Sequence, residues 1–225
     1  GGGVKTYSFA WFGALVLTVA MGTVSPVWAD TTYTPADAGW GGALTVADGE
    51  TAIIDAGGGG AWDGAITVSS NAVLKTHGTL RVNGTTTVDA GGTLDVESGT
   101  AYFSFGNKTM SGNLIIRQGA QLDINRSDSC YYHAAFAIHV YGTFNAQTFR
   151  TSVGVEDTVY LHDGARVIGT GDGNGAFDLF DSGCRLVVDG DVMCEAPLRA
   201  RDKNENLIVA CFENTRFNLA GGFAG

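Results

Sequence analysis

Residues that favour tight turns recur at short, nearly regular intervals in the middle of this chain, and this rhythm limits what can form between them. The turn positions are Gly64, Asn71, Gly78, Gly84, Gly92, Gly99, Gly106, Gly112 and Gly119. Glycine and asparagine tolerate the positive φ angles of such turns. Almost no ten-residue window after Ala29 carries apolar residues at helical spacing. The rhythm therefore predicts an all-β fold of short strands.

A short apolar phrase repeats within this rhythm. It occurs at even spacing as Gly64–Val68, Gly78–Val82 and Gly92–Val96, and related forms occur at Gly112–Ile116 and Leu122–Ile124. Within each phrase, apolar side chains alternate with polar ones, which is the period of a strand with one buried face. We expect the apolar side chains to point inward and the polar side chains to point outward. The inward set is Leu80, Val82, Leu94, Val96, Leu122 and Ile124, and the outward set is Arg81, Asp95 and Asp123.

Two arrangements of such strands compete. In a hairpin meander each strand reverses, and Asn83-Gly84 is a dipeptide that favours a two-residue hairpin. In a parallel β-solenoid, three sides of about seven residues form a rung of about 21 residues, and equivalent sides stack. We favour the solenoid, most simply a right-handed β-helix, because stacking of like on like explains why Leu-x-Val recurs at a fixed period.

The segment Gly78–Gly99, with its Gly-Thr-Leu-x-Val phrases, resembles the repeats in passenger regions of bacterial autotransporters and related exported right-handed β-helix proteins. The resemblance covers residues 42–125 well and the remainder loosely. It implies a rigid parallel β-helix, exported by a bacterium, that serves as a surface or secreted structural module.

The segment 1–29 has the features of a signal peptide. No charge occurs between Lys5 and Asp30, the stretch from Tyr7 to Val24 is rich in apolar residues, and Val27 and Ala29 have the pattern that signal peptidase needs. We expect cleavage after Ala29, with an uncleaved membrane anchor as the alternative. The segment 30–225 then forms a single β-solenoid domain, with regular repeats over about 42–125 and less regular ones over 126–225. The chain begins without methionine, so we expect it to be part of a longer reading frame.

The charge balance limits the partners. Thirteen basic residues against 23 acidic ones give a formal net charge of −10, which repels the phosphate backbone of nucleic acids. We therefore expect no nucleic-acid partner. Glycans or other surface molecules remain as partners, and membrane contact is expected only through the signal peptide or an unseen C-terminal anchor.

The four cysteines leave two interpretations open. An even count in an exported chain allows disulfides with three connectivities, whereas alternation places three of the thiols on the side of the neighbouring aliphatic residues, as small core residues. The cysteines are Cys130, Cys184, Cys194 and Cys211. No Cys-x-x-Cys pair occurs, so the sequence gives no support for a thiolate zinc site or redox motif.

Calcium is the metal that an acidic exported solenoid would hold, through oxygen ligands. The first candidate loop has EF-hand-like spacing but Leu207 where the sharp turn needs glycine; its acidic and amide residues are Asp202, Asn204, Asn206 and Glu213. A second, glycine-rich candidate contains Asp172, Asn174, Asp178 and Asp181. A plain polar turn explains either stretch, so we assign no metal ligand and expect no cofactor.

No catalytic group can be assigned from the sequence. Adjacent aspartates and the Asn-Thr-Asp and Gly-His-Gly motifs of β-helix polysaccharide lyases and hydrolases are absent. Asp178 with Asp181 is the one carboxylate pair that we considered for sugar-bond cleavage, and we favour two solvated turn acids as the explanation of this pair. The histidines stand apart in the sequence, at His77, His133, His139 and His162, and His139 has the position of an outward strand residue. Tyr131, Tyr132 and His133 form a candidate sugar-stacking group, and stacked aromatic residues of a solenoid explain them equally well. We expect a secreted or cell-surface adhesin-like module, with a carbohydrate-active β-helix enzyme as the alternative.

Overall fold

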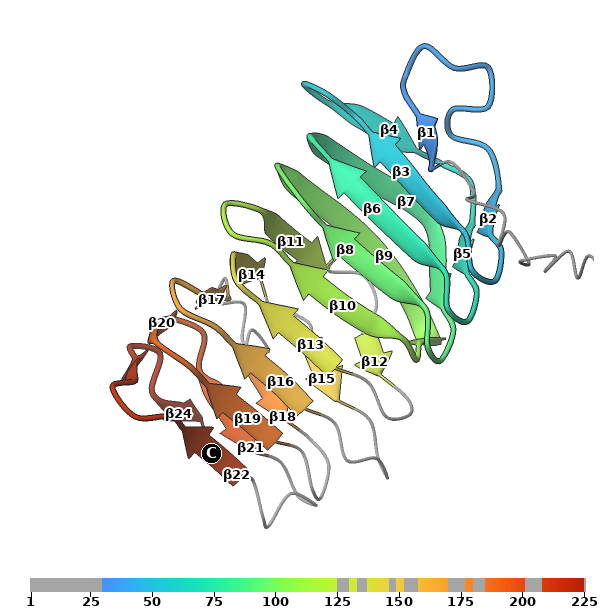
Figure 1. The fold of residues 1–225 in the computed structure, drawn as a ribbon. Coiled ribbons are helices and arrows are strands. Elements are labelled where there is room, and N and C mark those ends of the chain that lie inside the picture. The colour runs from blue at the N-terminus through green and yellow to red at the C-terminus, as the bar shows by residue number, and fades with distance from the viewer. Residues whose placement is uncertain are drawn as a thin grey trace, which may run out of the picture.

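The computed structural model describes residues 30–124, 130–132, 137–145, 149–151, 158–169, 177–179, 185–200 and 208–224. The predicted signal peptide and its cleavage site after Ala29 lie outside the described residues. The described part is a parallel β-solenoid of about 22 residues per turn without helix, which confirms the predicted fold class and rung length. Figure 1 shows the turns stacked in chain order from β1 to β24.

Each full turn contributes strand residues to each of three faces of the solenoid. The first face is a nine-stranded parallel sheet. Its strands are β1 (Thr31–Tyr33), β3 (Thr51–Asp55), β6 (Val73–His77), β8 (Thr93–Val96), β10 (Asn113–Ile116), β13 (Ala137–Val140), β16 (Thr158–Leu161), β19 (Arg185–Val188) and β22 (Ile208–Cys211).

The second and third faces belong to one 15-stranded sheet, because two long strands bend around the corner between them. These strands are β7 (Thr79–Val88) and β9 (Thr100–Met110). The second face also holds β4 (Gly60–Trp62), β11 (Gln121–Ile124), β14 (Thr143–Asn145), β17 (Arg166–Ile168), β20 (Asp191–Cys194) and β23 (Arg216–Leu219). The third face also holds β2 (Leu44–Val46), β5 (Ile66–Val68), β12 (Cys130–Tyr132), β15 (Phe149–Thr151), β18 (Phe177–Leu179), β21 (Leu198–Ala200) and β24 (Phe223–Ala224).

All pairings between described strands are parallel, so the hairpin alternative is wrong. Asn83-Gly84 lies inside β7, at its bend, where the chain turns a corner without reversing. A side chain on Gly84 would meet the backbone of the previous turn, because an added Cβ would lie 2.1 Å from the carbonyl oxygen of Gly64. This glycine therefore allows one turn to rest directly on another.

The predicted inward residues form the core. Leu80, Val82, Leu94, Val96, Leu122 and Ile124 are all buried. Of the outward set, Arg81 is exposed and Asp123 is partly buried, but Asp95 is buried although it points away from the core. Asp95 therefore points outward as predicted, and it is buried because the Arg117 side chain covers it.

The repeated phrase does not stack on itself. Ile66–Val68 lies on the third face, Leu80–Val82 on the second and Leu94–Val96 on the first. Successive copies of the phrase are two sides of a turn apart, so each copy lies on a different face. The ladders of like residues follow the longer period of a whole turn: Leu94 lies between Leu74 and Leu114 on the first face.

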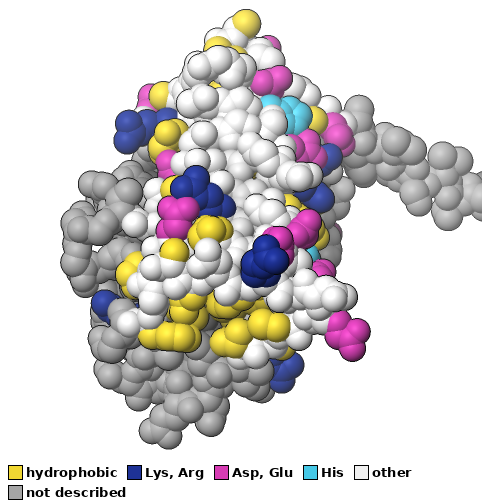
Figure 2. All heavy atoms as spheres, turned by 90° about the vertical axis from the view of Figure 1, so that its left-hand side faces the viewer, with side chains coloured by type: hydrophobic (Ala, Val, Ile, Leu, Met, Phe, Trp, Pro, Cys, Tyr) yellow, Lys and Arg dark blue, Asp and Glu magenta, His cyan; other side chains and the backbone are white. Residues whose placement is uncertain are grey.

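The two ends of the described solenoid differ. At the N-terminal end, the buried Trp62 ring makes edge contacts with the partly buried rings of Tyr33 and Trp40, at centroid distances of 5.8 and 5.3 Å. At the C-terminal end, Phe212 and Phe223 are 60% and 75% exposed. Figure 2 shows this side of the molecule, with hydrophobic side chains gathered in the lower part of the view.

Candidate functional site

Two rows of outward side chains run across the strands of the first face, and we call them together the outer stripe. The first row follows the register of the sheet and contains Lys75, Asp95, Ile115, His139, Tyr160 and Val187. The second row lies at the following corner and contains His77, Glu97, Arg117, Tyr141, His162 and Asp189. Backbone hydrogen bonds fix this second row, because each corner residue from Glu97 onward donates its N–H to a carbonyl of the turn before. Six successive strands of the first face thus carry the outer stripe, over a length of about 24 Å at the usual strand spacing.

Ion pairs fill the N-terminal half of the outer stripe. Glu97 pairs with Nζ of Lys75 at 3.2 Å and contacts Nε2 of His77 at 2.6 Å. The hydrogen bond with His77, assisted by the charge of Lys75, holds the pKa of Glu97 below its ordinary value against the opposing effect of burial. Glu97 is therefore a carboxylate at neutral pH, fixed between two side chains from the previous turn.

Arg117 and Asp95 form the next pair. The Nε and terminal nitrogen of Arg117 donate to the two carboxylate oxygens of Asp95 at 2.9 and 2.7 Å. This fork-to-fork hydrogen bonding raises the pKa of Arg117 further above its already high value. The Asp95 side chain is only 4% exposed, whereas that of Arg117 is 48% exposed, so the guanidinium presents its outer side to solvent.

Aromatic rings fill the C-terminal half. The His139 ring stacks on Tyr160 with centroids 4.5 Å apart, and the His162 ring stacks on Tyr141 at 3.9 Å. The two histidines also contact each other, with Nδ1 of His139 at 3.1 Å from Nε2 of His162. Burial is the main cause that lowers the pKa of both histidines, so both rings are neutral at pH 7. The four rings form one partly buried cluster.

The outer stripe is rich in groups that form hydrogen bonds. Its carboxylates, guanidinium, imidazoles and phenols can donate and accept hydrogen bonds toward a hydroxyl-rich ligand. The ion pairs Lys75–Glu97 and Asp95–Arg117 each join neighbouring turns, which holds these side chains in position. Side chains held in this way have little conformational freedom left to lose when a molecule binds to them.

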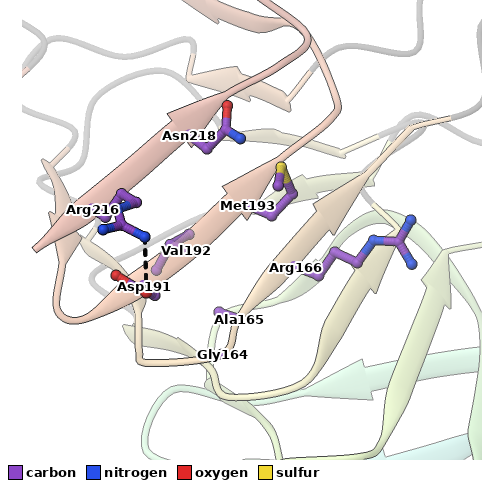
Figure 3. Close-up of a pocket in the computed structure, with 8 residues that line it drawn as sticks. All are labelled: Gly164, Ala165, Arg166, Asp191, Val192, Met193, Arg216 and Asn218. Carbon is purple, nitrogen blue, oxygen red and sulfur yellow. Dashed lines mark ion pairs between the residues drawn. The ribbon is translucent and has the colours of Figure 1, made fainter.

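A shallow groove of about 360 Å³ lies elsewhere, on the second face near the C-terminal end (Figure 3). It is lined by Gly164, Ala165, Arg166, Asp191, Val192, Met193, Arg216 and Asn218. Figure 3 shows Arg166 and Arg216 on opposite sides of Met193. Both guanidiniums are paired: Arg166 with Glu195 at 2.7 Å, and Arg216 more loosely with Asp191 at 3.7 Å. The groove therefore has no excess charge of either sign.

The candidate calcium and catalytic residues fall largely outside the described residues. This holds for Asp172, Asn174, Asp181, Asp202, Asn204, Asn206 and Leu207. Asp178 lies in β18, where its backbone pairs with Arg150 and Arg199, and Glu213 lies in the turn after β22. Within the described ranges, no group of three or more His, Cys, Asp or Glu side chains could hold a metal ion.

Of the aromatic candidates, too, some lie within the described residues and some outside them. Tyr131 and Tyr132 lie in β12 on the third face, and His133 lies outside the described residues. His139 is the outward strand residue that we predicted, since it lies between buried Ile138 and Val140. In the sequence the histidines stand apart, and nothing in their spacing indicated that His139 and His162 meet.

The structure describes the thiols of two of the four cysteines. Cys194 is a buried core thiol that donates to the carbonyl oxygen of Ala196 at 3.3 Å, and burial raises its pKa to about 12. Cys211 is a free, exposed thiol in the last strand of the first face. Cys130 lies in β12, and Cys184 lies outside the described residues. For Cys194 the core-thiol interpretation is therefore confirmed.

The remaining members of the outer stripe were missed by sequence reasoning. Glu97, Arg117 and Tyr141 lie just after the ends of first-face strands, at intervals of one turn. Tyr160 lies inside β16, in register with His139. That periodicity was available in the sequence, but it becomes visible only when the turn length is known. The repeated Leu-x-Val phrase follows a shorter interval and so does not align these positions.

In the part of the chain that the structure describes, no helix is long and apolar enough to cross a membrane. Comparison of the chain with protein-family models, with curated proteins and with solved structures gives no match. The structure therefore shows that the chain is a parallel β-solenoid. A proposal about its function rests on the residues of this chain alone.

Proposed function

We propose that this chain is a structural, adhesin-like module of a bacterial secreted or cell-surface protein, which presents the outer stripe to an extended partner. The observation that carries this proposal is the stripe itself. Its side chains recur on six successive strands and are held by contacts such as Asp95–Arg117 and His139–His162. Solenoids use surfaces of this kind, repeated at the strand spacing, to bind extended ligands.

Glycans are the partner class that we propose. The exposed edges of the stripe are hydrogen-bonding groups of both kinds, which suit a polymer of sugar hydroxyls. Repeated contacts along one polymer also add avidity without any single strong site. The net charge of −10 supports this choice over nucleic acid, because acidic side chains repel phosphates.

Export is part of the same proposal. The charge-free stretch before Asp30 and the Val27-x-Ala29 site support removal of residues 1–29 during secretion. Expression of the full chain in a bacterial host, followed by N-terminal sequencing of the secreted product, tests this. A mature terminus at Asp30 is expected, and a product that remains in the membrane with Gly1 intact would contradict export with cleavage.

A glycan-binding experiment tests the function. The mature chain is incubated with a panel of neutral and acidic polysaccharides, and binding is measured together with the release of new reducing ends or unsaturated products. We expect binding without turnover. Turnover would instead support the alternative of a carbohydrate-active enzyme, and an Asp178→Asn variant would then show whether that carboxylate takes part.

A pair of variants locates the binding surface. The triple variant His77→Gln, Tyr141→Ser and Tyr160→Ser removes side chains from both halves of the outer stripe. The matched control Arg81→Gln and Arg166→Gln removes two exposed side chains from the second face. Loss of binding in the first variant alone supports the stripe, provided circular dichroism shows both variants folded. Equal binding by both variants would place the binding surface elsewhere.

A further inference from the structure

His139 and His162 meet edge to edge. Their facing nitrogens are 3.1 Å apart, their ring planes differ by only 12°, and their centroids are 5.3 Å apart. The centroid distance exceeds the nitrogen distance by roughly the two centre-to-vertex lengths of imidazole. Both nitrogens therefore lie close to the line between the centroids, and the rings are nearly coplanar. This is the geometry of a single N–H···N hydrogen bond, in which one ring donates and the other accepts.

Each ring of the pair is also held from one side by a tyrosine. His139 lies parallel to Tyr160, within 2°, and His162 lies parallel to Tyr141, within 4°. The four residues come from two neighbouring turns, so the hydrogen bond and the two stacks tie these turns together on the outer side. Separation of the histidines would disturb both stacks.

Few charged groups face the pair. Arg117 acts on His139 from the preceding turn, but Asp95 binds its guanidinium. Asp189 acts on His162 from the following turn and favours its charged form. The other described neighbours in the two rows are Ile115, Val187 and the two tyrosines. No carboxylate among the described residues accepts a hydrogen bond from either imidazole, so nothing in them fully compensates a doubly charged pair.

We propose that the His139–His162 pair is a proton-operated switch in the outer stripe. In the neutral pair, one facing nitrogen carries a proton and the other accepts it. A first added proton can go to an outer nitrogen, which leaves this hydrogen bond in place. A second added proton puts hydrogens on both facing nitrogens, so the bond is lost and two like charges face each other at 3.1 Å. Double protonation therefore opens the pair.

The sign of the pH effect follows from proton binding. Because the folded rings have lowered pKa values, the unfolded chain binds more protons than the folded chain once the pH falls below about 6.5. The contribution of the pair to stability is complete above that pH and decreases below it. Since the rings interact, the two protons are expected to bind in two coupled steps.

The switch concerns the same surface as the proposed function, and its effect on a ligand rests on that function. Opening of the pair would displace Tyr141 and Tyr160 at mildly acidic pH and change the C-terminal half of the outer stripe. The opening itself requires no ligand, so it can be tested separately.

Histidine proton resonances of the mature chain, recorded by NMR between pH 8 and 4.5, provide the direct test. We expect the signals of His139 and His162 to titrate together, below the ordinary histidine range, with shifts of the Tyr141 and Tyr160 ring protons at the second step. Independent titration of both histidines near pH 6.5, without a change at the tyrosines, would overturn the proposal.

Thermal unfolding of two variants provides a second test. His162→Phe keeps a ring against Tyr141 but cannot be protonated, and His77→Phe is the matched control in the ionic half of the stripe. We expect the loss of Tm between pH 7.5 and 5 to be smaller in His162→Phe than in the wild type. A folded pKa that is lowered by 1 corresponds to a difference of about 3–5 °C. An equal loss in the wild type and His162→Phe would overturn the switch.

Two safeguards keep the tests separate. If His162→Phe does not fold, the switch is tested by the NMR titration of the wild type and by the same Tm comparison on a His139→Asn variant. Glycan binding measured at pH 7.5 and 5 then separates the two proposals: absence of binding at both pH values contradicts the proposed function, whereas the NMR titration alone decides the switch.

Discussion

The guanidinium of Arg117 binds both oxygens of the Asp95 carboxylate, one turn away, and covers it so completely that the Asp95 side chain is 4% exposed. The two partners are unequal, because Arg117 remains 48% exposed and can be solvated without Asp95. Removing the arginine leaves a buried carboxylate without its partner, and removing the aspartate leaves an arginine in contact with water.

This asymmetry predicts unequal effects of the two substitutions. We expect Arg117→Met to lower the free energy of unfolding by about 1–3 kcal/mol, the cost of a buried polar group without a partner, and Asp95→Leu to cost less. The double variant Asp95→Leu, Arg117→Met should recover most of the loss, since well-packed apolar side chains can replace such a pair. Urea unfolding of the four proteins measures the effect, and a larger loss in Asp95→Leu would show that this burial has been misassigned.

Glycine at position 99 is required by contact between turns as well as by its backbone conformation. Its φ is +75°, and an added Cβ would lie 2.1 Å from the carbonyl oxygen of Gly78. Gly119 has a similar φ of +78° but open space around it, which makes it a matched control. We expect Gly119→Ala to cost roughly 1–2 kcal/mol for the left-handed conformation alone. Gly99→Ala should cost about 1–3 kcal/mol more, because the backbone must move. Equal urea midpoints for the two variants would contradict the close contact.

Two buried threonines offer a route to higher stability. The hydroxyl groups of Thr76 and Thr86 are buried in the core and have no hydrogen-bond partner. Valine has nearly the same shape without the polar atom, so Thr76→Val and Thr86→Val should each raise the free energy of unfolding by about 1 kcal/mol. The partly exposed neighbour Thr87 serves as the control, and Thr87→Val should change stability by less than about 0.5 kcal/mol. A loss of stability in both core variants would reveal a partner for these hydroxyls.

The two placed thiols should differ strongly in reactivity. The thiolate is the reactive form, and burial raises the pKa of Cys194 to about 12, whereas Cys211 is exposed. We expect an alkylating reagent at pH 8 to modify Cys211 in the native protein and Cys194 only after unfolding. Mass spectrometry of peptides after timed labelling distinguishes the sites. Rapid labelling of Cys194 in the folded chain would show that the core around it opens.

Much of the fold could be predicted from the sequence, because short strands separated by turn residues leave few alternatives. Alternation assigned Leu80, Val82 and Leu94 to the core correctly. Local rules were sufficient there, since the direction of a side chain in a strand depends only on parity. The candidate site was different: alternation gave the direction of His139 but not its neighbours.

The tertiary structure decided which residues meet, and the reason is the variable length of the turns. Leu74, Leu94 and Leu114 follow one another at equal intervals on the first face. The interval from Leu114 to its partner Ile138 is longer, and the one from Val159 to Leu186 is longer still. An insertion at one corner shifts the register of every later residue relative to a fixed period.

The contact of His139 with His162 and the cover of Asp95 by Arg117 each join residues from different turns. The sequence by itself therefore determined the short strands and their inward faces, and it favoured the solenoid over a hairpin meander. The stacking of turns brought distant side chains into contact, because only the folded backbone sets the length of each turn.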